Sequence, residues 1–393
     1  MDRVRVLQRH LAHPGGAERT EHENIALAAA CAGARRRHVL VTGGAGFIGS
    51  HTVVELLDAG YCVTVVDSLV NSSAESIRRV GEITGLPERV RLVECDLCDA
   101  AALAHTFDTA AASTFGTFDA CIHFAALKAV GESVAKPLEY YANNMGGTFN
   151  LLRALRAAGC RNLVFSSSAT VYGDAPVPYS EESTTGNGVA SPYGQTKCMI
   201  ERVLRDVADP RAASGTPEAA AWRVALLRYF NPVGAHPSGR IGEDPRGIPN
   251  NLMPFISRVC VGRLDQLTIF GNDYATADGT CERDYIHVTD LAKGHVAALH
   301  HVERLGPAPY CEAFNLGSGR PTSVLQMVRA MEKATGKRVP FIFGARREGD
   351  LPCFYADPQR AREVLGWQTE RNVDDMCEDT WRWQRANPDG LRK

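Results

Sequence analysis

The chain has 393 residues, of which 45% are hydrophobic and 22% are charged, and its formal net charge is −2. This length suffices for two domains or for one large α/β unit with an appended lobe, and the composition is ordinary for a globular enzyme. The near-neutral charge gives no case for binding to nucleic acid or a membrane surface, and no apolar run approaches the roughly 20 residues of a membrane-spanning helix.

Residues 1–37 are predicted to lie outside the fold, because they hold no aromatic residue and their apolar positions are mostly alanine. Within them, Arg3-Val4, five further residues and His10-Leu11 are similar to the bipartite signal that directs proteins into peroxisomes and glycosomes. A disordered basic extension and a mitochondrial transit peptide are the alternatives, and the absence of serine together with four acidic residues argues against the latter. We therefore expect import into a peroxisome or glycosome, with cytoplasmic residence as the alternative.

From His38 a short buried strand leads into a turn with glycine at positions 43, 46 and 49, then a helix, then a strand that ends at Asp67. This order predicts a dinucleotide-binding site. Gly43 and Gly46 allow the backbone to approach a pyrophosphate at the helix N-terminus, and Gly49 allows close packing of helix and strand. Because Asp67 would accept hydrogen bonds from ribose and repel a 2′-phosphate, we expect NAD rather than NADP.

Strands and helices continue to alternate after Asp67. Further strands are predicted at residues 90–96, 119–126, 162–168 and 224–230, and helices at residues 100–117, 139–158 and 199–208. Alternation of this kind predicts an α/β fold with a Rossmann-like, doubly wound parallel sheet. Ligands bind such sheets at the carboxyl ends of the strands, where Asp67, Phe124 and Ser168 lie.

The 12 cysteines are scattered, and we expect reduced thiols and no disulfide framework. Cys95 and Cys98 have the spacing of a metal-binding pair. A zinc site needs four protein ligands, or three and a water, and no second pair of cysteines or histidines accompanies them. The sequence therefore predicts no metal site.

A helix is predicted to start at Ser191-Pro192, since proline is tolerated in a first helical turn. Tyr193 and Lys197 would then lie one turn apart on the same helical face. A free tyrosine has a pKa of about 10, and a nearby cation favours the phenolate, so this pair could supply a base for a substrate hydroxyl. Such a pair also occurs by chance on surface helices. The Gly-x-x-Gly-x-x-Gly spacing and Tyr-x-x-x-Lys together resemble the short-chain dehydrogenase/reductase superfamily.

From Asn231 the pattern loosens, and many glycines and prolines separate short segments. We predict a NAD-binding domain at residues 38–230 and a smaller C-terminal α/β lobe, mainly for substrate, at residues 231–393. Phe314–Gly317 is predicted to form a strand that returns to the first domain. We therefore expect a segment at about 285–320 to belong to the NAD-binding domain, so that the two domains are interleaved in the sequence.

Seven longer stretches are similar to the UDP-glucose 4-epimerase family, an extended branch of that superfamily. They are residues 123–133, 136–141, 165–173, 227–237, 248–254, 283–288 and 346–352. The resemblance runs from about residue 38 to 387. It implies an NAD-dependent isomerase that interconverts UDP-galactose and UDP-glucose through a 4-keto intermediate, as in galactose metabolism. It also implies a homodimer packed through two helices of each subunit.

The resemblance assigns roles to individual positions. Tyr193 is the expected base for the sugar 4-hydroxyl, Lys197 holds the nicotinamide ribose, and Ser168 hydrogen-bonds the reacting oxygen. The matched cofactor positions are Gly43, Gly46, Phe47, Ile48, Gly49, Asp67, Asn71, Ser72, Asp96, Leu97, Phe124, Lys128, Asn143, Tyr193, Lys197 and Phe230. The matched substrate positions are Ser168, Thr170, Asn231, Asn250, Asn251, Leu252, Arg283, Arg347, Asp350 and Phe354.

Two sequence features and the alternative functions qualify these expectations. Cys281-Glu282 stands where the family often has Gly-Val, so the Glu282 carboxylate could compete for Arg283 or point to solvent. Phe354 stands at the wall beside the sugar 2-substituent, and its bulky ring predicts little activity on N-acetylated sugars. The alternatives are another nucleotide-sugar epimerase or dehydratase, although Ala169-Thr170 replaces the acidic pair that dehydration needs, and a non-catalytic NAD-sensing regulator.

Overall fold

The computed structural model describes residues 35–209, 211, 221–347 and 350–391. All helices and strands named here belong to the unit of residues 37–393. The predicted import signal at residues 3–11 lies outside the described residues.

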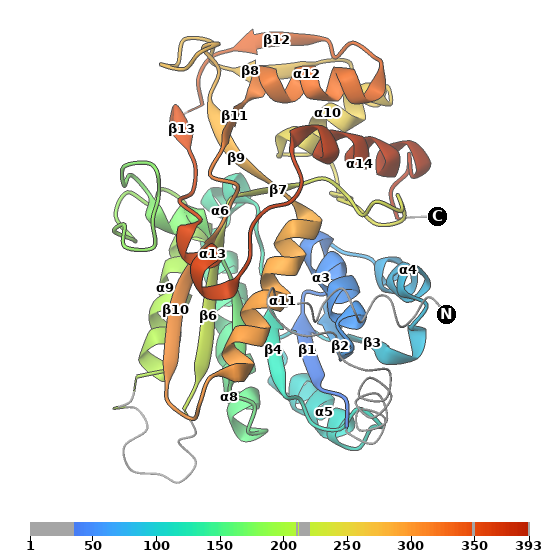
Figure 1. The fold of residues 1–393 in the computed structure, drawn as a ribbon, viewed down its shortest axis with the longest axis vertical. Helices are drawn as coiled ribbons and strands as arrows, with labels where there is room; N and C mark the ends of the chain where they lie inside the picture. Colours follow the sequence, from blue (N-terminus) through green and yellow to red (C-terminus); the bar gives the residue numbers. More distant parts are fainter. Residues whose placement is uncertain (1–34, 210, 212–220, 348–349, 392–393) are drawn as a thin grey trace, which may run out of the picture. The chain divides into compact units, whose positions relative to one another are not determined.

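Seven strands form one sheet in which every neighbouring pair is parallel (Figure 1). Their bounds are β1 His38–Thr42, β2 Cys62–Asp67, β3 Val90–Glu94, β4 Ala120–His123, β5 Asn162–Ser168, β6 Arg223–Tyr229 and β10 Tyr310–Leu316. The order across the sheet is β10-β6-β5-β4-β1-β2-β3. This is the strand order of a dinucleotide-binding sheet with one added strand, and it confirms the predicted Rossmann-like fold.

Helices cover both faces of this sheet because successive side chains of a strand point to opposite faces. The helices are α3 Phe47–Asp58, α4 Ala74–Thr84, α5 Ala100–Ala111, α6 Val130–Ala135, α7 Pro137–Tyr141, α8 Gly147–Ala157, α9 Pro192–Val207 and α11 Val288–Arg304, with 3₁₀ turns η1 Pro87–Arg89 and η3 Ala169–Tyr172. Val39 and Val41 belong to the apolar core that includes residues of α3, α4 and α11. Leu40, between them, belongs to the core that includes residues of α5, α8 and α9.

The single helix predicted at residues 139–158 is divided in the structure. A π-helical turn, η2 Ala142–Gly146, separates α7 from α8. The Asn144 side chain accepts a hydrogen bond from the Leu127 N–H and donates to the Leu127 carbonyl and the Thr196 hydroxyl. Such π-helical turns often occur at functional sites, and Asn143 in this one lines the cavity described below.

The C-terminal part has its own apolar core, built from α10, α12, α14 and short strands. The elements are β7 Asn231–Val233, α10 Leu252–Cys260, β8 Leu267–Phe270, β9 Glu282–His287, β11 Pro321–Ser323, α12 Val324–Thr335, β12 Phe341–Gly344, β13 Cys353–Phe354, α13 Gln359–Leu365 and α14 Val373–Ala386. β10, from the segment predicted to return, pairs with β6 along its whole length. The predicted domain boundary at residue 231 stays a prediction.

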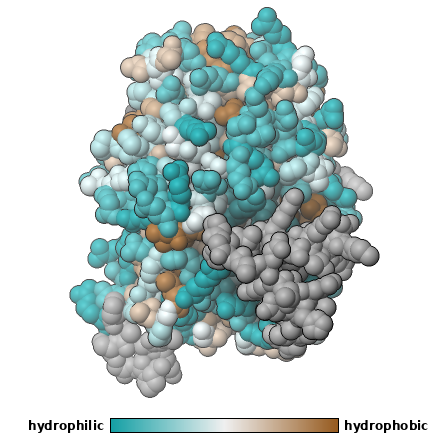
Figure 2. Space-filling view, viewed as in Figure 1, coloured by the Kyte–Doolittle hydropathy of each residue, from teal (hydrophilic) through white to brown (hydrophobic). Residues whose placement is uncertain are grey.

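In the view of Figure 2, hydrophilic side chains dominate and the hydrophobic ones form small, separate patches. No helix in the described ranges is long and apolar enough to cross a membrane. The cysteines of the described residues are free thiols; most are buried or partly buried, but Cys98 is exposed.

Candidate active site

A cavity of about 710 Å³ opens at the carboxyl ends of β1, β2, β4, β5 and β6 and continues to α10, β8 and β9. The structure brings nearly all the predicted site residues to its lining. Those on the lining are Gly43, Gly46, Phe47, Ile48, Gly49, Asp67, Asn71, Asp96, Leu97, Phe124, Lys128, Asn143, Ser168, Thr170, Tyr193, Lys197, Phe230, Asn231, Asn250, Asn251, Leu252, Arg283, Arg347, Asp350 and Phe354. Ser72 is the exception.

The glycine turn between β1 and α3 forms a cradle that side chains would fill. Gly43 has a left-handed φ of 68°, and a Cβ there would lie 2.6 Å from the backbone nitrogen of Ala125. A Cβ on Gly49 would lie 2.4 Å from the Gly43 carbonyl oxygen. No side chain caps α3 at Gly46, so the first N–H groups of this helix are free to bind an anion. The cradle therefore fits a dinucleotide pyrophosphate.

Asp67 at the end of β2 is buried and held in a fixed orientation. Its Oδ1 accepts hydrogen bonds from the Leu69 N–H at 2.9 Å and the Ser72 hydroxyl at 2.7 Å, and its Oδ2 accepts one from the Ala45 N–H at 3.0 Å. Each carboxylate oxygen keeps a further lone pair, so the group can still accept from a ribose. Ser72 thus helps to orient Asp67 from outside the cavity lining, and its predicted contact with the cofactor stays a prediction.

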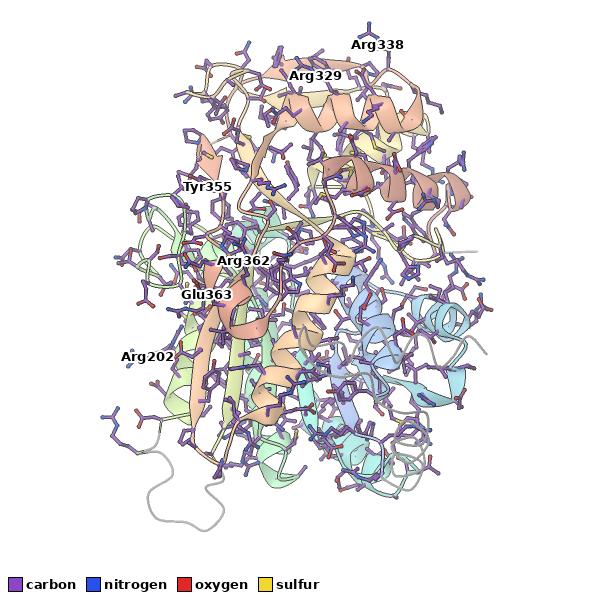
Figure 3. The ribbon with its side chains drawn as sticks, viewed as in Figure 1. Arg202, Arg329, Arg338, Tyr355, Arg362 and Glu363 are labelled. Carbon is purple, nitrogen blue, oxygen red and sulfur yellow. The ribbon has the colours of Figure 1, made fainter. Side chains whose placement is uncertain are left out.

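Helix α9 presents one buried face to the site. It begins at Pro192, as predicted, and the Ser191 hydroxyl accepts a hydrogen bond from the Gly194 N–H at 3.1 Å. Tyr193 and Lys197 line the cavity from this face. Arg202 points away from α9 into solvent, as Figure 3 shows. The 3.6-residue period of α9 therefore places the cavity-lining side chains and the solvent-facing ones on different faces of the helix.

Burial controls the ionisation of Tyr193 and Lys197. It raises the pKa of the Tyr193 phenol to about 12, and a hydrogen bond with Ser168 lowers it only in part. Burial lowers the pKa of Lys197 to about 7, against the opposing effect of the Glu201 carboxylate. Lys197 Nζ donates to the Ser166 carbonyl at 2.5 Å and lies 5.9 Å from the centre of the Tyr193 ring. Burial is thus the main cause of the raised phenol pKa, and the expected effect of Lys197 on the phenol stays a prediction.

Two arginines of the C-terminal part, Arg283 and Arg347, also line the cavity. Arg283 Nη2 lies 3.1 Å from Asp350 Oδ1, and its Nη1 donates to the Leu351 carbonyl at 2.8 Å. The Glu282 carboxylate accepts a weak hydrogen bond from the Cys353 thiol at 3.5 Å. The sequence left open whether the Glu282 carboxylate competes for Arg283 or points to solvent. In the structure its hydrogen-bond partner is instead the Cys353 thiol.

Arg347 and Phe354 form two further parts of the cavity lining. The Arg347 guanidinium lies 4.1 Å from the centre of the Phe270 ring. The Phe354 ring packs 4.9 Å from Tyr179 and 5.4 Å from Phe230, measured between ring centres. Because aromatic neighbours support it, this ring forms a firm wall that cannot readily give way to a larger substrate.

The sequence reasoning missed several lining residues. Ser166, Tyr229, Phe270 and Tyr285 all line the cavity. The Ser166 hydroxyl and the Tyr229 phenol hydrogen-bond to one another beside Lys197. Ser166 and Tyr229 could have been found from the sequence, because they lie near the carboxyl ends of β5 and β6, where ligands of such sheets bind.

Comparisons with known proteins identify the family of this chain. Residues 39–317 match the family model described as the NAD dependent epimerase/dehydratase family. A UDP-glucose 4-epimerase of Mus musculus is 55% identical over 361 residues, covering 90% of this chain and 98% of the relative, and one of Bacillus subtilis (strain 168) is 53% identical over 355 residues, covering 90% and 98%. The crystal structure of UDP-glucose 4-epimerase from Bifidobacterium longum in complex with NAD⁺ and UDP matches at a TM-score of 0.81 and 47% identity, covering 90% of this chain and 99% of that one.

The family model spans more than half of the chain, and both relatives are matched over nearly their whole length. The chain belongs to the NAD-dependent epimerase/dehydratase family and, within it, to the UDP-glucose 4-epimerases.

Proposed function

We propose that this protein interconverts UDP-galactose and UDP-glucose with a resident NAD, through a 4-keto sugar. The observation that carries the proposal is the arrangement of one cavity. Its lining joins a glycine cradle for a pyrophosphate, the group Ser168, Tyr193 and Lys197, and the arginines Arg283 and Arg347. A cofactor and a nucleotide-sugar can thus meet at the catalytic side chains.

The bound NAD⁺ supplies the acceptor for the hydride that leaves the sugar C4. Tyr193 takes the proton of the 4-hydroxyl and later returns it, so it acts first as base and then as acid. The hydrogen bond with Ser168 favours the Tyr193 phenolate and thereby opposes the effect of burial. Lys197, held by the Ser166 carbonyl, is placed to hydrogen-bond the nicotinamide ribose.

Epimerisation requires that the 4-keto sugar turn over while its UDP stays bound. Arg283 and Arg347 carry the positive charge that a diphosphate needs, and Asp350 can accept hydrogen bonds from the uridine ribose. These groups come from the C-terminal part of the chain and line the same cavity as the glycine cradle. Return of the hydride to the other face of C4, together with transfer of the proton from Tyr193 to the 4-oxygen, would complete the inversion and leave NAD unchanged overall.

The test is a coupled assay. The purified protein is mixed with UDP-galactose, and UDP-glucose dehydrogenase with added NAD⁺ reports the product as NADH. The proposal predicts NADH formation that depends on both proteins. Conversion of UDP-glucose to a dehydrated 4-keto-6-deoxy sugar would identify a dehydratase instead, and bound NAD without any turnover would identify a sensor.

We also propose a homodimer formed through α9 and the helical segment that precedes it in the chain, which includes α6 and α7. The exposed apolar side chains in this region include Val134 at 62%, Leu138 at 78% and Met199 at 43% relative exposure, on α6, α7 and α9. Burying such side chains between two copies is favourable. Light scattering should give twice the chain mass for the wild type and the single mass for Leu138→Glu. A monomeric wild type would contradict the proposal.

The N-terminal residues carry a separate proposal, import into a peroxisome or glycosome, which rests on Arg3-Val4 and His10-Leu11 alone. Residues 1–30 fused to a fluorescent reporter should give punctate signal. Arg3→Glu should make it diffuse, and a diffuse signal from the unmodified fusion would exclude import.

A further inference from the structure

The loop that follows β2 holds a strained backbone next to the predicted ribose site. Leu69 has a φ of 55°, and it is the non-glycine residue with positive φ in the part of the chain that the structure describes. Val70 and Asn71 line the cavity, and the Leu69 N–H donates to Asp67 Oδ1. L-residues adopt this left-handed conformation at a cost, so it persists only where other contacts stabilise it.

Those contacts come from one arginine of the C-terminal part. The Arg246 guanidinium donates to the carbonyl oxygen of Val70, to that of Leu69 at 2.9 Å and to that of Ser72 at 3.1 Å. A planar fork with five N–H donors can hold three carbonyl groups of one loop in a fixed relation. A lysine, with a single compact ammonium on a flexible stem, cannot hold the same set as rigidly.

Arg246 is itself held in place. Arg258 of α10 donates to the Pro245 carbonyl at 2.7 Å and to the Gly247 carbonyl, on either side of Arg246. The chain continues directly into residues 248–252, which line the substrate end of the cavity. A continuous set of contacts therefore runs from α10 through Arg246 to the loop that orients Asp67.

We propose that Arg246 is a positioning residue for the cofactor, which keeps the loop of residues 69–72 closed beside the adenosine ribose and so slows the release of NAD. The inference rests on the proposed function. Without Arg246, the carbonyl groups of the loop lose their shared donor and Leu69 is free to leave its left-handed conformation. The Leu69 N–H then no longer fixes Asp67, and the ribose loses an oriented acceptor.

The test measures NAD release directly. NAD-loaded protein, wild type or variant, is first passed through a desalting column to remove free nucleotide. Labelled NAD is then added as competitor, and the original nucleotide that remains bound to the protein is measured over time. Arg246→Ala should release NAD about tenfold faster, the effect of losing one charge-assisted hydrogen bond. Arg246→Lys should release it at an intermediate rate.

Arg240→Ala is the matched control. Arg240 comes from the same stretch of chain, and its guanidinium pairs with Glu82 of α4, away from the ribose loop. Its NAD release should equal that of the wild type. Epimerase activity of Arg246→Ala should fall on dilution and return when excess NAD is added, a rescue that a general loss of folding would not show.

Two results would overturn the inference: an unchanged release rate in Arg246→Ala, or an equal acceleration in Arg240→Ala. The binding measurement contains no sugar nucleotide, so it does not depend on turnover. A wild type that fails to retain NAD would instead count against the proposed function.

Discussion

Replacing Glu201 by glutamine is expected to destabilise the fold by about 3–5 kcal/mol, because the change leaves a buried charge without its partner. Glu201 lies one turn after Lys197 on α9, and its side chain and that of Arg228 on β6 are each 2% exposed. Glu201 Oε1 accepts from the Ser167 hydroxyl at 2.6 Å and Arg228 Nε at 2.9 Å. Its Oε2 accepts from Arg228 Nη2 at 2.6 Å and Arg205 Nη2 at 3.0 Å.

The magnitude follows from these four contacts. Glutamine keeps the volume of glutamate, so packing is preserved, but its NH₂ group presents donors to a guanidinium that can only donate. The positive charge of Arg228 then stays buried without compensation. Ser167 stands between Ser166, which holds Lys197, and the predicted catalytic Ser168. Turnover should therefore fall together with stability.

The assay is urea unfolding of the NAD-free protein, followed by tryptophan fluorescence. The double variant Glu201→Leu/Arg228→Met removes both charges and should lose less stability than Glu201→Gln alone. Glu370→Gln is the matched control, because its ion pair with Lys293 is exposed and should contribute less than about 1 kcal/mol. A loss in Glu201→Gln no larger than in Glu370→Gln would refute the reasoning.

Three further predictions concern the site. Tyr193→Phe should keep NAD bound but lower turnover by at least about 10²-fold, the contribution of a general acid–base group; a near-normal rate in the coupled assay would mean that another residue moves the proton. Burial lowers the pKa of Lys197 from about 10.5 to about 7, so between pH 7 and 10.5 the unfolded chain binds more protons than the folded one and the free energy of unfolding rises with pH. Lys197→Met should flatten that rise when urea unfolding is measured across this pH range. An equal rise in both proteins would exclude Lys197 as its source. Phe354→Ser should raise turnover of UDP-N-acetylglucosamine relative to UDP-glucose by about tenfold or more, measured side by side, whereas an unchanged ratio would place the limiting wall elsewhere.

The sequence alone determined the parts of the protein that depend on local spacing. Glycines at three-residue intervals after a buried strand indicated the cradle and the start of α3, and the structure leaves no room for a side chain at Gly43 or Gly49. The same holds for Ser191-Pro192 as a helix start and for Tyr193 and Lys197 on one face of α9. The longer motifs added the family and, with it, the positions that line the cavity.

Only the tertiary structure decided how these residues act on one another. The orientation of the Glu282 carboxylate towards Cys353, the support of Asp67 by Ser72 and the high pKa of Tyr193 all depend on which groups surround each side chain in space. Arg246 is the clearest case, since its partners at Leu69, Val70 and Ser72 lie far away in the chain. Local patterns set the backbone conformation, whereas burial and long-range hydrogen bonds arise only when separate segments pack together.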